Sequence, residues 1–134
     1  MNAVGLSLDT SVVLRLLVQE PPTLFHLAAQ FVESQLEAKV PVHVSDLVLA
    51  EAYFALQSFY QLPKTDALRA LGSFAQASGV TITPAARRVL TISHLATAKP
   101  GFVDRLIHGA SHAEKRTLVT FEKAAKKLPG TVVL

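Results

Sequence analysis

The chain has 134 residues, of which half are hydrophobic and 17% are charged, and its formal net charge is +3. This composition excludes a disordered tail, and the length predicts a single domain over residues 1–134. The absence of cysteine excludes disulfides and thiolate metal sites. No apolar run reaches the roughly 18 residues of a membrane span, and the N-terminal segment lacks the basic start of a signal peptide. We therefore expect a cytoplasmic protein.

Strand-like and helix-like segments alternate along the first half of the chain. Ser45 and Asp46 are candidate caps of one expected helix, Thr65 is the candidate N-cap of the next, and Asp46 suits a cap better than a metal ligand. A third helix is amphipathic, with apolar residues on one face at Leu24, Leu27, Ala28, Phe31 and Leu36. The expected elements are a strand at 4–8, helices at 10–18 and 23–38, a strand at 40–44, and helices at 45–60 and 63–79.

The second half repeats this alternation. Thr83 and Pro84 form an N-cap and first-turn proline pair that begins a helix. The expected elements are a strand at 80–82, helices at 83–98 and 102–112, and strands at 117–121 and 131–134. Strands that alternate with helices predict an α/β domain with a mainly parallel central sheet flanked by helices. In such sheets, functional sites gather at the carboxyl ends of the strands.

Four acidic residues stand where apolar segments end or begin, namely Asp9, Glu51, Asp104 and Glu122. They are too far apart in the sequence for a local motif, so only the fold could bring them together. Two like charges about 4 Å apart repel by roughly 4 kcal/mol at an effective dielectric near 20, and a shared cation would offset this repulsion. Carboxylate oxygens favour Mg²⁺ or Mn²⁺ over softer metals. The four acids therefore predict a divalent metal site.

Each acid also has a structural alternative. Asp9 could cap the helix that follows it, and Asp104 could cap its own helix. Glu51 could be a solvent-facing helix residue, and Glu122 could pair with the lysines at 123, 126 and 127.

A second constellation spaces Asp104, His108 and His112 four residues apart, which is compatible with zinc. No third histidine or cysteine is fixed nearby, and no His-Glu-x-x-His pattern is present. The sequence also lacks a glycine-rich phosphate loop and a Gly-x-Ser-x-Gly nucleophile motif.

Charge is unevenly distributed between the two halves of the chain. Residues 1–84 contain four basic and seven acidic side chains, a balance of −3, whereas residues 85–134 contain nine basic and three acidic ones, a balance of +6. An acidic cluster beside a basic flank suits a polyanion that must meet a metal. The alternative is that the basic residues only solubilise the surface.

Four segments carry a resemblance to a known family: VGLSLDTSVVLRLL, VSDLVLAEAYFAL, GFVDRLIHGAS and TLVTFEKAAKKLPG. Their order resembles that of PIN-domain nucleases, and their spacing is most similar to the VapC toxins of bacterial toxin–antitoxin pairs. The resemblance runs from residue 4 to about residue 130. It implies a PIN fold in which Asp9, Glu51 and Asp104 match the first three metal-binding acids. Glu122 departs from the pattern, because the family usually has aspartate there.

The resemblance implies a metal-dependent endoribonuclease, the toxin of a toxin–antitoxin pair, with Mg²⁺ or Mn²⁺ as cofactor. Its catalytic and metal-binding residues would be the four acids, and Thr120 would orient a metal-bound water. The implied partners are RNA, a VapB-like antitoxin and a second copy in a homodimer. Two alternatives are a degenerate PIN domain that binds RNA or protein, and an RNA-processing nuclease without antitoxin. The candidate RNA-contacting residues are Arg15, Lys99, Arg105, Lys115 and Arg116.

Overall fold

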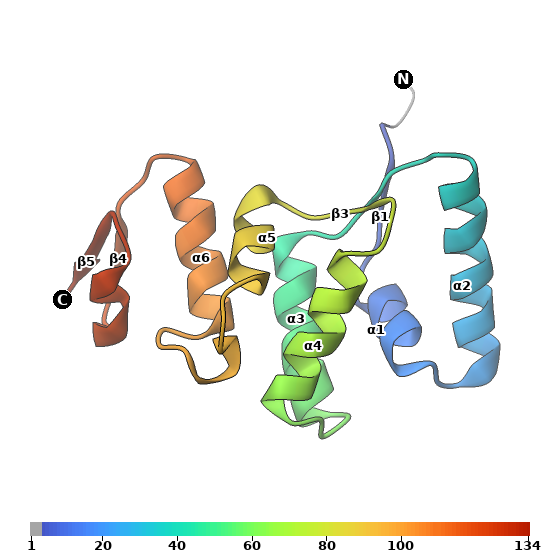
Figure 1. Cartoon of the computed structure of the whole chain (residues 1–134), viewed down its shortest axis with the longest axis horizontal. Helices are drawn as coiled ribbons and strands as arrows, with labels where there is room; N and C mark the ends of the chain where they lie inside the picture. Colours follow the sequence, from blue (N-terminus) through green and yellow to red (C-terminus); the bar gives the residue numbers. More distant parts are fainter. Residues whose placement is uncertain (1–3) are drawn as a thin grey trace. The chain divides into compact units, whose positions relative to one another are not determined.

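The computed structural model describes residues 4–134, which divide into two compact units with the boundary between Thr83 and Pro84. Helices and parallel strands alternate along the chain (Figure 1). The predicted α/β class with parallel strands is thereby confirmed, whereas the single domain expected over residues 1–134 stays a prediction. No helix in the described part of the chain is long and apolar enough to cross a membrane.

The first unit contains a three-stranded parallel sheet and four helices. The strand order is β1-β2-β3, and the register pairs Leu6 with Val42 and Val42 with Val80. The sheet is therefore parallel throughout, as expected for strands joined by helical crossovers. Its elements are β1 (Leu6–Ser7), α1 (Thr10–Val18), α2 (Pro22–Glu37), β2 (Val42–His43), α3 (Asp46–Ser58), α4 (Lys64–Ala75) and β3 (Val80–Thr81).

The core of the first unit lies where α1, α3 and α4 pack together and around β2. Val13 of α1, Val42 of β2, Leu49 of α3 and Leu71 of α4 have no solvent exposure. Burial of a Val or Leu side chain contributes about 1.5–3 kcal/mol. Helix α2 buries one residue of its 16, Val32, whereas the shorter helices α3 and α4 bury four each. The apolar face predicted for α2 is therefore largely exposed.

The second unit pairs two helices with a two-stranded parallel sheet. Strands β4 and β5 align Leu118 with Thr131, and helices α5 and α6 pack against each other. Phe102 and Leu106 of α6 are almost completely buried. The elements are α5 (Pro84–Leu90), the 3₁₀ helix η1 (Leu95–Thr97), α6 (Phe102–Ala113), β4 (Leu118–Thr120), the 3₁₀ helix η2 (Lys123–Lys127) and β5 (Thr131–Val133).

The helix expected over residues 83–98 is shorter than predicted. Helix α5 ends at Leu90, and a separate turn forms η1. The Thr91 hydroxyl donates to the Arg88 carbonyl at 2.7 Å, and His94 has a left-handed backbone with φ of 58°. A hydroxyl that bonds the preceding turn competes with the helix for its carbonyl, which explains the early end.

Two predicted caps are wrong. Helix α4 begins at Lys64 after Pro63, without a side-chain cap, so Thr65 lies inside the helix instead of before it. Helix α3 is capped by Ser45, which accepts from the Val48 amide at 3.3 Å. Asp46 therefore does not cap α3; its carboxylate accepts a hydrogen bond of 2.7 Å from the Thr83 hydroxyl.

Candidate functional site

Asp9 lies two residues beyond the end of β1, where it is the N-cap of α1. Its Oδ1 accepts hydrogen bonds from the Ser11 hydroxyl at 2.6 Å and from the Val12 amide at 3.2 Å. These bonds hold the pKa of the exposed Asp9 carboxyl below its usual value, and the bond from Ser11 contributes most. The capping role is therefore present, and the same bonds favour the ionised form of the carboxylate and orient it, as a metal ligand requires.

Glu51 is connected to this end of α1 through Thr10. The Thr10 hydroxyl donates to Glu51 Oε1 at 2.8 Å, although 41 residues separate them in the sequence. Glu51 is exposed on α3, and Thr10 directly follows Asp9. Two of the four predicted acids, Asp9 and Glu51, are therefore both held at the N-terminal end of α1, in the first unit. Thr10 was not among the residues predicted for the site; its signal in the sequence is a hydroxyl residue directly after the acid, at the first position of the helix.

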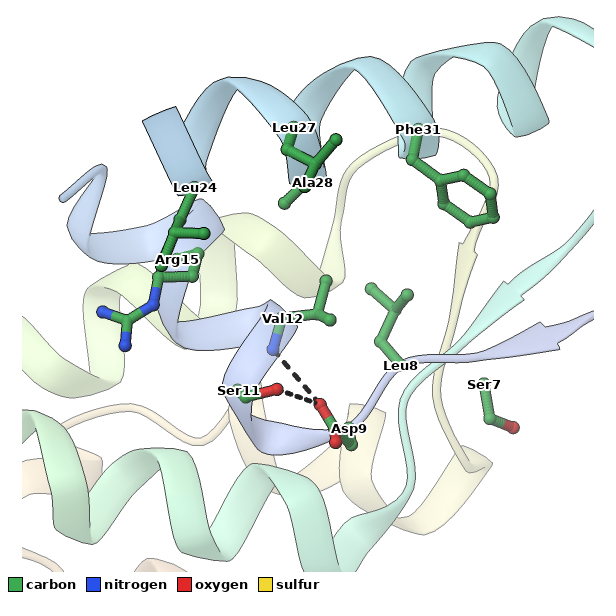
Figure 2. A pocket seen from close by; sticks show the side chains of 10 residues that line it. All are labelled: Ser7, Leu8, Asp9, Ser11, Val12, Arg15, Leu24, Leu27, Ala28 and Phe31. Carbon is green, nitrogen blue, oxygen red and sulfur yellow. Dashed lines mark hydrogen bonds between the residues drawn. The ribbon is translucent and has the colours of Figure 1, made fainter. Parts of the chain in front are cut away.

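An apolar groove of about 700 Å³ runs from Asp9 along α1 and α2. Figure 2 shows Leu27 and Phe31 of α2 opposite Leu8 and Val12. Leu27 is 67% exposed and Phe31 is 52% exposed, which is unusual for side chains of this size on adjacent turns. The complete lining is Ser7, Leu8, Asp9, Ser11, Val12, Arg15, Leu24, Leu27, Ala28 and Phe31.

Glu122 occupies the corresponding position after β4, in the second unit. It lies two residues beyond the strand and caps η2, where Oε1 accepts from the Ala124 amide at 3.0 Å. The Glu122 amide donates to the Thr120 hydroxyl oxygen, also at 3.0 Å. Glu122 therefore has a capping role within its own segment. The proposed role of Thr120 in orienting water stays a prediction.

Asp104 lies in the first turn of α6 and is exposed. It does not cap the helix, because Gly101 is the N-cap and makes no side-chain cap bond. An acid in a first helical turn interacts favourably with the positive end of the helix dipole.

The four acids are divided between the units, with Asp9 and Glu51 in the first and Asp104 and Glu122 in the second. Within residues 4–134, no group of three or more histidine, aspartate or glutamate side chains that could hold a metal ion is present. The donors fit Mg²⁺ or Mn²⁺ in chemistry, since all are exposed carboxylates. Their assignment as one metal site stays a prediction.

Some of the candidate RNA-contacting residues already form hydrogen bonds within the protein, and others are exposed to solvent. Arg15 is half-buried and donates to the Glu20 carbonyl at 3.0 Å and to the Tyr60 hydroxyl at 3.2 Å. Arg105 donates through Nε to the Pro100 carbonyl at 2.7 Å. The other three candidates are exposed: Lys99, Lys115 and Arg116.

The two histidines of the zinc hypothesis have other partners. Their rings stack with centroids 5.4 Å apart, and His108 Nε2 lies 2.7 Å from the Pro129 carbonyl oxygen. That oxygen can only accept, so Nε2 carries the proton and donates. This nitrogen is therefore unavailable to a metal.

The comparisons with known proteins give one finding. A family model described as PIN domain matches residues 6–130, which include all four acids. No curated protein and no solved structure gives a significant match.

Proposed function

The chain belongs to the PIN-domain family, and we propose that it is a cytoplasmic, metal-dependent endoribonuclease that acts as the toxin of a toxin–antitoxin pair. PIN domains are typically nucleases and generally use divalent metal ions, so a nuclease-type function follows from the family itself. The observation that carries the more specific proposal is the ordered, ionised Asp9 carboxylate at the carboxyl end of β1, joined through Thr10 to Glu51.

In the proposed mechanism, Asp9 and Asp104 are the main metal ligands, and Glu51 and Glu122 complete the set directly or through water. When bound, Mg²⁺ or Mn²⁺ supplies a more acidic water and compensates charge at the scissile phosphate. The protein's own contribution is positioning. Ser11 and Val12 fix the Asp9 carboxylate, and the Thr10 hydroxyl fixes Glu51. Ligands held by such bonds lose little freedom when the substrate arrives.

Cleavage of single-stranded RNA in the presence of Mn²⁺ tests this proposal directly. Wild-type protein should cut a labelled RNA with Mn²⁺ and leave it intact with EDTA, and Asp9→Asn should not cut it under either condition. Arg69→Ala is a matched control, because Arg69 lies on α4 in an exposed ion pair with Asp66 at 3.1 Å. Cleavage that persists in Asp9→Asn would contradict the assigned role.

The exposed groove along α1 and α2 supports the toxin–antitoxin part of the proposal. Its apolar residues Leu24, Leu27 and Phe31 would be covered by a segment of a VapB-like antitoxin, which would also approach Asp9. Further exposed apolar residues on or just after α3, namely Leu47, Phe54 and Phe59, offer a surface for the proposed homodimer. Growth inhibition on induced expression, relieved by a small neighbouring gene, would distinguish a toxin from an RNA-processing nuclease.

A second candidate function is a degenerate PIN domain that binds RNA without cutting it. The glutamate at position 122 favours it, because the family usually has aspartate there and one extra methylene displaces the carboxylate from a metal that demands near-ideal geometry. Calorimetric titration with Mn²⁺ separates the two functions. The nuclease proposal expects weaker binding in Glu122→Gln than in wild type, whereas a degenerate site expects negligible binding in both.

A further inference from the structure

A small basic pocket lies between α5 and α6, entirely within the second unit. Its volume is about 300 Å³. Four of its lining side chains are basic: Arg88, Arg105, His108 and His112. Its remaining lining residues are Ala85, Val89, Ile92, Gly109, Leu128 and Pro129, so no acidic side chain of the described chain lines it.

The walls of this pocket are held rigidly. The backbone of α6 approaches α5 closely at Gly109, where an added Cβ would lie 2.9 Å from the Ala85 Cβ. His108 is fixed by its bond to Pro129 and by stacking on His112. A pocket built on two packed helices presents its donors with little conformational freedom, which favours binding of a defined group.

The two arginines supply donors that the fold itself does not use up. Arg105 donates through Nε and through one N–H of Nη2, at 2.7 and 3.4 Å, to carbonyls of the preceding loop. A guanidinium has five N–H donors, so others remain for a ligand. The Arg88 side chain is exposed in the last turn of α5.

We propose that this pocket binds a backbone phosphate of RNA through Arg88, Arg105 and His112. Guanidinium groups match phosphate geometry well. The surrounding unit favours a polyanion, because its nine basic and three acidic residues give a balance of +6. The inference rests on the proposed function only in taking RNA as the ligand.

The test measures RNA affinity without divalent metal, so that cleavage plays no part. A short fluorescein-labelled single-stranded RNA is titrated with the full chain in EDTA at several salt concentrations, and anisotropy is recorded. Losing one phosphate contact should lower the salt slope by about 0.7 and weaken binding about fivefold near 0.1 M salt. We expect this for Arg88→Ala, and a smaller loss for Arg88→Lys. His112→Ala removes a hydrogen-bonding ring and no formal charge, so it should weaken binding with little change in the salt slope.

Arg87→Ala is the matched control, because Arg87 is also exposed on α5, carries the same charge and does not line the pocket. It should change the affinity by less than twofold. Equal losses in Arg87→Ala and Arg88→Ala would overturn the proposal, because general surface charge would then explain the binding. Unchanged RNA affinity in Arg88→Ala, with a melting temperature like that of wild type, would also overturn it.

Two further arms separate the sources of the ligand and the two proposals. Inorganic phosphate should compete for the part of the binding that depends on Arg88, whereas competition by polyglutamate alone would indicate an acidic protein segment and overturn the RNA assignment. RNA cleavage with Mn²⁺ is scored separately. Binding that depends on Arg88 without cleavage would reject the nuclease proposal alone, and cleavage with no effect of Arg88→Ala on affinity would reject the pocket alone.

Discussion

The Thr10 hydroxyl donates a 2.8 Å hydrogen bond to the Glu51 carboxylate, and so joins the start of α1 to the middle of α3. Thr10 follows Asp9, whose carboxylate is itself oriented by Ser11. Two consecutive residues, Thr10 and Ser11, therefore position two acids that lie far apart in the sequence. This relationship holds an acid of α3 beside the N-terminal end of α1, where Asp9 also lies.

Removal of the Thr10 hydroxyl should weaken both catalysis and stability. Thr10→Val keeps the shape of the side chain but leaves Glu51 without its hydrogen-bond donor. We therefore expect the free energy of unfolding to fall by about 0.5–1.5 kcal/mol. RNA cleavage should fall about tenfold, because Glu51 is misplaced. Thr10→Ser should retain most activity. A double-mutant cycle with Glu51→Gln measures the link, and additive effects on cleavage would show that the two residues do not act together.

The sequence was sufficient to predict the elements on which the acids lie. The alternation of apolar residues placed β1 before Asp9 and β4 before Glu122, and both acids follow their strands by two residues. These positions depend on local periodicity and on turn residues, which are properties of adjacent residues. The fold class could be predicted for the same reason.

The sequence was not sufficient where side chains from distant segments meet. The link from Thr10 to Glu51 depends on how α1 packs on α3, and the basic pocket depends on the close approach of Gly109 to Ala85. The early end of α5 depends on one rotamer of Thr91. None of these follows from periodicity, because each is decided by tertiary packing or by a single hydrogen bond.

Two helical glycines should respond oppositely to alanine. Gly109→Ala places a Cβ 2.9 Å from the Ala85 Cβ. The overpacking should destabilise the protein by about 1–3 kcal/mol, which exceeds the roughly 1 kcal/mol gained in helix propensity, so the variant should be less stable than wild type. Gly72→Ala, on α4, meets nothing within 4 Å and should stabilise by about 1 kcal/mol. Urea unfolding measures both. Stabilisation by both substitutions would show that α5 and α6 are farther apart at Gly109 than the 2.9 Å contact implies.

The groove along α1 and α2 should matter for neutralisation but not for toxicity. Leu27→Lys should keep growth inhibition and lose relief by the co-expressed antitoxin, because a charge would then face its apolar segment. Ile107→Lys is the matched control, since Ile107 is 51% exposed on α6 and belongs neither to the groove nor to the surface proposed for the homodimer. Growth curves measure both variants. Equal loss of relief in the two variants would assign the antitoxin to a different surface.

Asp9 combines a cap with a proposed metal ligand, and two substitutions separate these roles. Asparagine is as good an N-cap as aspartate, so Asp9→Asn should leave the unfolding free energy without metal within about 0.5 kcal/mol of wild type, whereas Asp9→Ala should lose about 1 kcal/mol. Mn²⁺ at a hundredfold excess over its Kd should stabilise wild type by about 2.7 kcal/mol. Both variants should lose that gain, because each removes the charge. Thermal melting with and without Mn²⁺ measures all three proteins. If Mn²⁺ stabilises Asp9→Asn as much as wild type, Asp9 is a helix cap and not a metal ligand.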